Sequence, residues 1–177
     1  MINVKETKRE FLMSLFNQDI KKILDLGCGK GLMSKFFANK GAKIIGIDLN
    51  KIVEESPNFK LIEGDIRKEN FGEKNDLIIA SLILHFLNKN DSLQIIERMK
   101  TATSKLGYNL LVCMSDKDEN AKKKTEKFYP NIQELIKIYS DWKLIKEISD
   151  ISEIEDHDNI GPHQHHLNFV LFQNKTE

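Results

Sequence analysis

Residues 23–31 read Ile-Leu-Asp-Leu-Gly-Cys-Gly-Lys-Gly, an apolar run that meets an acid and then three glycines spaced Gly-x-Gly-x-Gly. This order predicts a buried strand, a tight turn and the start of a helix. Glycine suits such a turn because a Cβ would block both positive φ values and the close approach of a ligand to the backbone. Amide groups at the start of the helix would point toward that ligand. The stretch therefore predicts a cofactor site at the end of the first strand.

The length and composition of the chain limit the number of domains and the kinds of partner that we expect. The 177 residues are enough for one domain with a substantial core, and we expect a single domain over residues 1–177 with residues 1–20 as an N-terminal helix or cap. The 27 basic and 27 acidic side chains balance, which gives no general attraction to nucleic acid or to anionic membranes. Cys28 and Cys113 are too few for a disulfide framework. The polar amino terminus and the lack of a membrane-length apolar run favour a cytoplasmic protein.

Helix-like and strand-like segments alternate along the chain. We expect helices over residues 5–18, 31–40, 91–104 and 131–139, and strands over residues 21–26, 43–48, 59–62, 76–80, 108–114, 143–148 and 166–172. The apolar side of the second helix would carry Leu32, Met33, Phe36 and Phe37, and Gly41 would end that helix. Continuous apolar strands separated by helices indicate an α/β fold with a parallel sheet covered on both faces. The last two strands, without a helix between them, indicate an antiparallel pair at one edge.

Two classes of cofactor fit a glycine turn followed by an acid. A dinucleotide-binding fold has the fingerprint Gly-x-Gly-x-x-Gly, in which the third glycine lies one place later than Gly31. In either class an acid at the end of the second strand takes the ribose hydroxyls, and Asp48 holds that position. The spacing alone leaves both classes open.

Further motifs resemble those of class I S-adenosylmethionine-dependent methyltransferases over nearly the whole length. The family's motifs are matched, in order, by the acid-glycine stretch at 25–31, by Asp48, by Asp65 just after the third strand, and by Asp76 and Ser81 in the fourth. The resemblance implies a three-layer, Rossmann-like, seven-stranded and mostly parallel sheet with an antiparallel last strand. It also implies S-adenosyl-L-methionine as the cofactor and methyl transfer as the reaction.

The resemblance implies a role for each matched position. The expected cofactor-binding residues are Asp25, Gly27, Cys28, Gly29, Gly31, Asp48, Leu49, Asp65, Ile66 and Ser81. Asp25 would orient the glycine turn or reach the cofactor's ammonium, and the turn itself would lie against the methionine half. Asp48 would accept hydrogen bonds from the ribose, and charged acceptors make the stronger bonds. Asp65 would accept one from the adenine amino group, with Leu49 and Ile66 packing on the ring. A purely structural role for either acid, as a turn residue or helix cap, is the alternative.

Five histidines supply the candidate catalytic residues. Methyl transfer depends on orientation and exclusion of water, and it needs a general base only if the nucleophile carries a proton. His85 follows the fourth strand, whereas His163 and His165 precede the last strand beside His157 and His166. We expect His85, His163 and His165 to act on the acceptor; packing or solvated histidines are the alternative. No closed set of metal ligands is visible, so no metal is expected.

The end of the chain narrows the resemblance to tellurite-resistance-type and related small methyltransferases. These close with a Pro-His-x-His segment, an apolar strand and a basic residue, matched by residues 162–165, residues 169–172 and Lys175. The resemblance implies a small-molecule acceptor, covered by residues 1–18 or by a second subunit in a homodimer. The Asn/Asp-Pro-Pro-Tyr/Phe motif of amino-directed nucleic-acid methyltransferases is absent, so a nucleic-acid partner is not expected. Methylation of a protein or RNA, and cofactor binding without catalysis, are the other readings.

Overall fold

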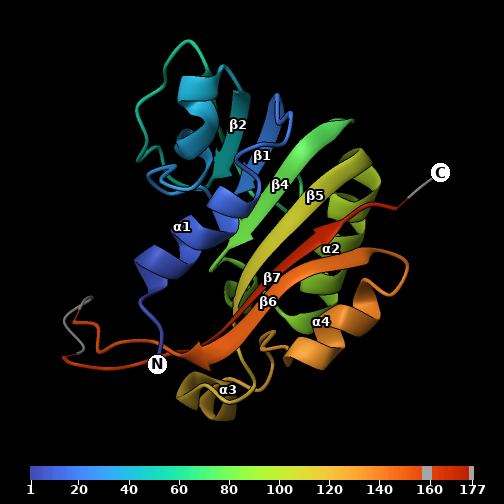
Figure 1. Ribbon diagram of the computed structural model, residues 1–177. Coiled ribbons are helices and arrows are strands. Elements are labelled where there is room, and N and C mark those ends of the chain that lie inside the picture. Colours follow the sequence, from blue (N-terminus) through green and yellow to red (C-terminus); the bar gives the residue numbers. More distant parts are fainter. Residues whose placement is uncertain (157–160, 176–177) are drawn as a thin grey trace.

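A seven-stranded sheet runs through the molecule in the order β3-β2-β1-β4-β5-β7-β6 (Figure 1). The computed structural model describes residues 1–156 and 161–175. The strands are β1 (Lys22–Leu26), β2 (Lys43–Asp48), β3 (Phe59–Glu63), β4 (Asn75–Ser81), β5 (Thr103–Met114), β6 (Lys143–Ile151) and β7 (His166–Gln173). Strands β1 to β5 pair in parallel, whereas β7 pairs antiparallel with both β5 and β6. The predicted sheet with an antiparallel last strand is confirmed.

Helices cover both faces of this sheet, which makes three layers (Figure 1). The helical segments are α1 (Val4–Ser14), η1 (Ser34–Lys40), η2 (Leu84–Phe86), α2 (Lys89–Ala102), α3 (Glu119–Lys123) and α4 (Ile132–Ile138). Successive strand residues point to opposite faces, so Ile23 packs in the same buried cluster as Phe11 of α1. Leu24 packs in the other cluster, with Ile96 of α2 and Leu135 of α4. None of the helices in the described parts of the chain is long and apolar enough to cross a membrane.

The helix after the glycine turn differs from the prediction. It is a 3-10 helix that begins at Ser34, because the turn continues past Gly31, whose φ is 65°. Met33 and Phe37 are buried as predicted, but Leu32 lies outside the helix and is 78% exposed. The prediction that Leu32 packs on the apolar side is therefore wrong. Gly41 ends the helix in the left-handed conformation, with a φ of 81°, as predicted.

The amino terminus is tied to the far edge of the sheet. The backbone N–H of Ile2 donates to Ile151 O at 2.8 Å, and that of Glu153 donates to Ile2 O at 2.9 Å. Within α1, the ring of Phe11 packs on that of Phe169 in β7, and the ring centroids are 5.6 Å apart. These contacts hold α1 across the sheet and place its first turn beside residues 152–155.

Candidate functional site

The glycine turn joins β1 to η1 at the carboxyl end of the parallel strands. Its φ values are 64° at Gly27, 50° at Gly29 and 65° at Gly31, a region that L side chains rarely adopt. A Cβ on Gly27 would lie 2.6 Å from the side chain of Ile83, and one on Gly31 would lie 2.8 Å from Phe59. At Gly29 nothing lies within 4 Å of that position. Glycine is therefore required by conformation at all three positions and by space at two of them.

A cavity of about 200 Å³ lies above this turn. It is lined by Lys8, Asp25, Gly27, Cys28, Lys30, Leu32, Met33 and Ser81. The strand ends thus bring together four residues that the sequence predicted for the cofactor, namely Asp25, Gly27, Cys28 and Ser81. The lysine that joins them from α1 was not predicted.

Asp25 and Lys8 give this cavity a pair of opposite charges. Asp25 is 3% exposed, and its burial raises the pKa of its carboxyl to about 6, although the nearby Ser34 and Lys8 favour the ionised form. Burial also lowers the pKa of the Lys8 ammonium, while Glu155 and Asp25 oppose that shift. Buried charges are costly without a partner of opposite sign. The arrangement suits a ligand that carries one positive and one negative charge.

Asp48 connects the end of β2 to the glycine turn. Its Oδ2 accepts the backbone N–H of Gly29 at 2.9 Å, and its Oδ1 accepts that of Asn50 at 3.0 Å. The Asp48 side chain therefore stabilises a turn, which is the alternative role that the sequence left open for it. A carboxylate offers about four acceptor positions, so the turn and a ligand can share it. Leu49, the next residue, is 68% exposed beside this carboxylate.

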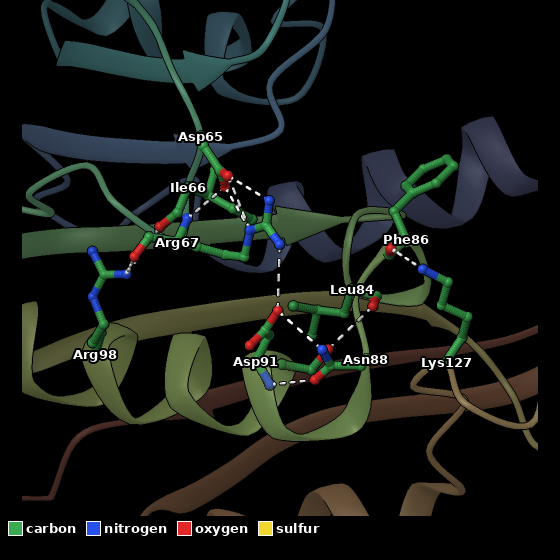
Figure 2. A network of polar contacts seen from close by, with 10 residues as sticks. Asp65, Ile66, Arg67, Leu84, Phe86, Asn88, Asp91, Arg98 and Lys127 are labelled. Carbon is green, nitrogen blue, oxygen red and sulfur yellow. Dashed lines mark hydrogen bonds and ion pairs between the residues drawn. The ribbon is translucent and has the colours of Figure 1, made fainter.

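Asp65, just after β3, is held by an arginine that sequence reasoning missed (Figure 2). Nε of Arg67 lies 3.0 Å from both carboxylate oxygens, and Nη2 lies 2.6 Å from Oδ2. These bonds lower the pKa of the Asp65 carboxyl to about 2. Nη1 of the same arginine lies 3.5 Å from Asp91, in the first turn of α2. The carboxylate predicted to meet adenine is thus fixed in direction.

A second arginine fixes the loop that carries Asp65. Nη1 of Arg98, on α2, donates to the carbonyl oxygens of Ile66 at 2.9 Å and Arg67 at 3.0 Å (Figure 2). Nη2 of Arg98 donates to the carbonyl oxygen of Glu69. Ile66 is 5% exposed and packs in the core beneath the loop. The adenine end of the predicted site is therefore built on α2 as well as on the strand ends.

His85 lies in η2, the short helix after β4. Its Nδ1 is buried and has no hydrogen-bond partner among residues 1–156 and 161–175. Burial lowers the pKa of the ring to about 4, and the neighbouring His165 lowers it further while Asp118 opposes this. The ring packs 4.2 Å from that of Phe86. His85 is therefore neutral near neutral pH.

The two tail histidines predicted for catalysis meet at the start of β7. The rings of His163 and His165 are 4.9 Å apart, and Nδ1 of His165 lies 3.0 Å from Oδ2 of Asp118. Asp118 also accepts the backbone N–H groups of Asn120 and His166. Although burial raises the pKa of the Asp118 carboxyl, these hydrogen bonds lower it overall. Sequence reasoning missed Asp118, whose one local signal is its position just before α3.

Two further predictions about the carboxyl-terminal histidines concern His157 and a metal site. His157 lies outside the described residues. Within residues 1–156 and 161–175, no group of three His, Cys, Asp or Glu side chains is placed to hold a metal ion.

A larger cavity of about 820 Å³ adjoins the first. It lies between α1, the start of η1 and residues 153–155, and it shares Lys8, Leu32 and Met33 with the smaller cavity. Residues of the N-terminal segment thus line this cavity, and their predicted role as a cap over the acceptor stays a prediction.

Comparison with known proteins gives a consistent family. The family model described as "Tellurite resistance protein TehB" matches residues 3–172. The Haemophilus influenzae protein named "Probable S-adenosyl-L-methionine-dependent methyltransferase TehB" is 30% identical over 149 residues, which are 79% of this chain and 52% of that protein. The chain therefore spans about half the length of the curated relatives that it matches first.

Solved structures share the fold. The crystal structure of TehB from Haemophilus influenzae has a TM-score of 0.76 at 23% identity, covering 94% of this chain and 62% of that one. The N-methyltransferase NodS from Bradyrhizobium japonicum, solved in complex with S-adenosyl-L-homocysteine, has a TM-score of 0.75 at 16% identity, covering 98% of this chain and 89% of NodS. Because the family model spans nearly the whole described chain and the sheet order agrees with it, the chain belongs to the TehB family and has the fold of class I S-adenosylmethionine-dependent methyltransferases.

Proposed function

We propose that this protein is an enzyme that binds S-adenosylmethionine at the carboxyl ends of β1, β2 and β3 and transfers its methyl group to a small molecule. The buried Asp25 and the half-buried Lys8, which line the same cavity above the glycine turn, are the observation that carries this proposal. The amino-acid end of this cofactor carries an ammonium, which suits Asp25, and a carboxylate, which suits Lys8. A cavity of about 200 Å³ matches a group of that size.

The same pair argues against a dinucleotide. In dinucleotide-binding folds the pyrophosphate lies over the glycine turn. Here the Asp25 carboxylate lines the space above that turn together with Lys8 and Lys30, and charges of both signs suit an ammonium and a carboxylate better than the two negative charges of a pyrophosphate. Asp48, Leu49 and Asp65 then take the ribose and adenine, as the family resemblance implies.

The chain's own residues do the work of positioning. When bound, S-adenosylmethionine supplies a methyl group already activated on a sulfonium. Leu32 and Met33 line both cavities and offer apolar surface beside that point. If the acceptor carries a proton, His165 can take it, because the bond from its Nδ1 to Asp118 fixes the orientation of the ring. His163 and the neutral His85 lie in the same group of rings and are the other candidates.

Methyl transfer itself can be followed with S-adenosylmethionine labelled in the methyl group. The protein is incubated with the label and, separately, with a small-molecule extract, a protein extract and RNA. We expect the label in the small-molecule fraction. Label confined to the protein or RNA fraction would replace the proposed acceptor class, and binding without any transfer would indicate a sensor. Inorganic tellurite is included because of the family's description.

Cofactor affinity should depend on pH through Asp25. Its pKa is raised to about 6, so the carboxyl is ionised near neutral pH and becomes protonated as the pH falls through about 6. The proton removes the charge that attracts the cofactor's ammonium. The Kd for S-adenosylhomocysteine should therefore rise as the pH falls below about 6, and Asp25→Asn should bind more weakly near neutral pH with a flatter profile. Calorimetric titration at several pH values measures this; the same slope in both proteins would contradict it.

Arg67→Ala should weaken cofactor binding slightly. Without the guanidinium, the Asp65 carboxylate loses its fixed direction toward the adenine, but the pair is partly exposed, so we expect only a roughly two- to fivefold rise in Kd. Calorimetry with S-adenosylhomocysteine checks the value. Tighter binding by the variant would show that Arg67 competes with the adenine for Asp65.

A further inference from the structure

We infer that Leu82 is a positioning residue for the cofactor, because its left-handed backbone turns the end of β4 so that Ile83 supports the glycine turn. The inference rests on the proposed function, since it takes the 200 Å³ cavity as the place of the cofactor's amino-acid end. The conformation at residue 82, and not the bulk of its side chain, keeps this cavity in shape.

Leu82 adopts a backbone conformation that is unfavourable for leucine. Its φ is 55°, in the left-handed region where a Cβ crowds the following carbonyl oxygen and where glycine is the residue that fits. Its N–H still donates to the carbonyl oxygen of Val112 in β5 at 2.8 Å, so the chain follows the sheet as far as this residue. The chain therefore turns away at Leu82, one residue after β4 ends at Ser81. Strained residues of this kind cluster at ligand sites, where the surrounding structure holds them.

The left-handed residue exchanges the sides of the sheet on which the next two side chains pack. Along β4, Ile79 packs in the buried cluster that contains Phe11 of α1, and Ala80 packs in the cluster on the opposite side. Because successive strand residues alternate, a regular strand would send Leu82 to the side of Ala80 and Ile83 to the side of α1. Instead, Leu82 packs against the α1-side cluster and Ile83 against the opposite one.

Ile83 is thereby placed against the glycine turn. A Cβ on Gly27 would lie 2.6 Å from Cδ1 and Cγ1 of Ile83, so the two residues are in contact and leave no room for a side chain. Gly27 and Ser81 both line the 200 Å³ cavity. With residue 82 in an extended conformation, Ile83 would move to the other side of the sheet and the turn would lose this support. The shape of the cavity therefore depends on the backbone at residue 82.

Glycine and alanine at position 82 separate conformation from packing. Leu82→Gly and Leu82→Ala both remove the branched part of leucine, and they differ from each other by one methyl group. In an ordinary helix or strand alanine is the more stabilising of the two, whereas at a positive φ the preference is reversed. A protein whose binding-competent conformation is less populated binds its ligand more weakly in proportion. We therefore expect Leu82→Gly to bind S-adenosylhomocysteine at least threefold more tightly than Leu82→Ala in calorimetric titration.

Leu106 supplies the matched control. Its φ is 59°, and it is 57% exposed in β5, at the amino end of the parallel strands and away from the glycine turn. Leu106→Gly and Leu106→Ala should bind S-adenosylhomocysteine with equal Kd. At both positions the glycine variant should unfold at a higher temperature than the alanine variant, because the backbone preference is the same. The difference in Kd should be found at position 82 alone.

A Kd ratio below threefold between Leu82→Ala and Leu82→Gly would overturn the inference. The same ratio in the pair at Leu106 would also overturn it, because the effect would then be one of stability alone. If glycine at position 82 prevents folding, Leu82→Asn takes its place in the ratio, since asparagine also adopts the left-handed conformation. If the wild-type protein does not bind S-adenosylhomocysteine, it is the proposed function that fails.

Discussion

Lys8→Met should raise the Kd for S-adenosylhomocysteine about 30-fold or more. Lys8, from α1, lines the small cavity together with Asp25 and with Lys30 of the glycine turn. Removing one partner of a desolvated charge pair costs roughly 2 kcal/mol or more, and each 1.4 kcal/mol is tenfold in Kd. The methionine keeps the length and the apolar stem of the lysine, so the loss reports the charge. Calorimetric titration measures it.

The matched control is Lys21→Met. Lys21 precedes β1 at the amino end of the parallel strands, where it pairs with Asp19 and is exposed. We expect this variant to bind S-adenosylhomocysteine like the wild type. Thermal unfolding of both variants shows whether the fold is kept. If Lys8→Met binds as tightly as the control, Lys8 does not contact the cofactor.

Asp48→Ala should weaken binding by roughly 1.5–3 kcal/mol, about 10- to 150-fold in Kd. The alanine removes the carboxylate proposed for the ribose, and it also releases the backbone N–H of Gly29 that Oδ2 holds. Both losses weaken cofactor binding. Asp48→Asn, which keeps one acceptor oxygen, should fall between the wild type and the alanine variant.

Asp19→Ala serves as the control for this second change, because Asp19 is an exposed acid just before β1, at the amino end of the parallel strands and away from their carboxyl ends. Its Kd should equal that of the wild type. A dissociation constant for Asp48→Ala within twofold of the control would show that Asp48 has the turn role alone.

Much of the fold and of the candidate site could be predicted from the sequence, because both depend on short local stretches. Nine consecutive residues contain the strand and its glycine turn, and the three glycines adopt the positive φ values that we expected. Asp25 and Asp48 could be predicted as site residues because both lie at the ends of apolar strands, and ligands bind at the carboxyl ends of parallel strands. The antiparallel last strand followed from the family resemblance and from the absence of a helix before it.

The residues that were missed come from elements far apart in the sequence. Lys8 reaches the glycine turn because α1 crosses the sheet, and Asp118 meets His165 across 47 positions. Arg67 was missed although it is close to Asp65, because an exposed arginine in a loop gives no pattern. Leu32 was misplaced since hydrophobic spacing does not show where the turn ends and the helix begins.

The most direct test of the account is calorimetric titration of the protein with S-adenosylmethionine, S-adenosylhomocysteine and NAD. We predict saturable binding of the first two, one molecule to each chain, and no binding of NAD, because Asp25, Lys8 and Lys30 above the glycine turn offer charges of both signs, which suit an amino-acid end better than a pyrophosphate. Binding of NAD in place of S-adenosylhomocysteine, or binding of neither, would contradict the account.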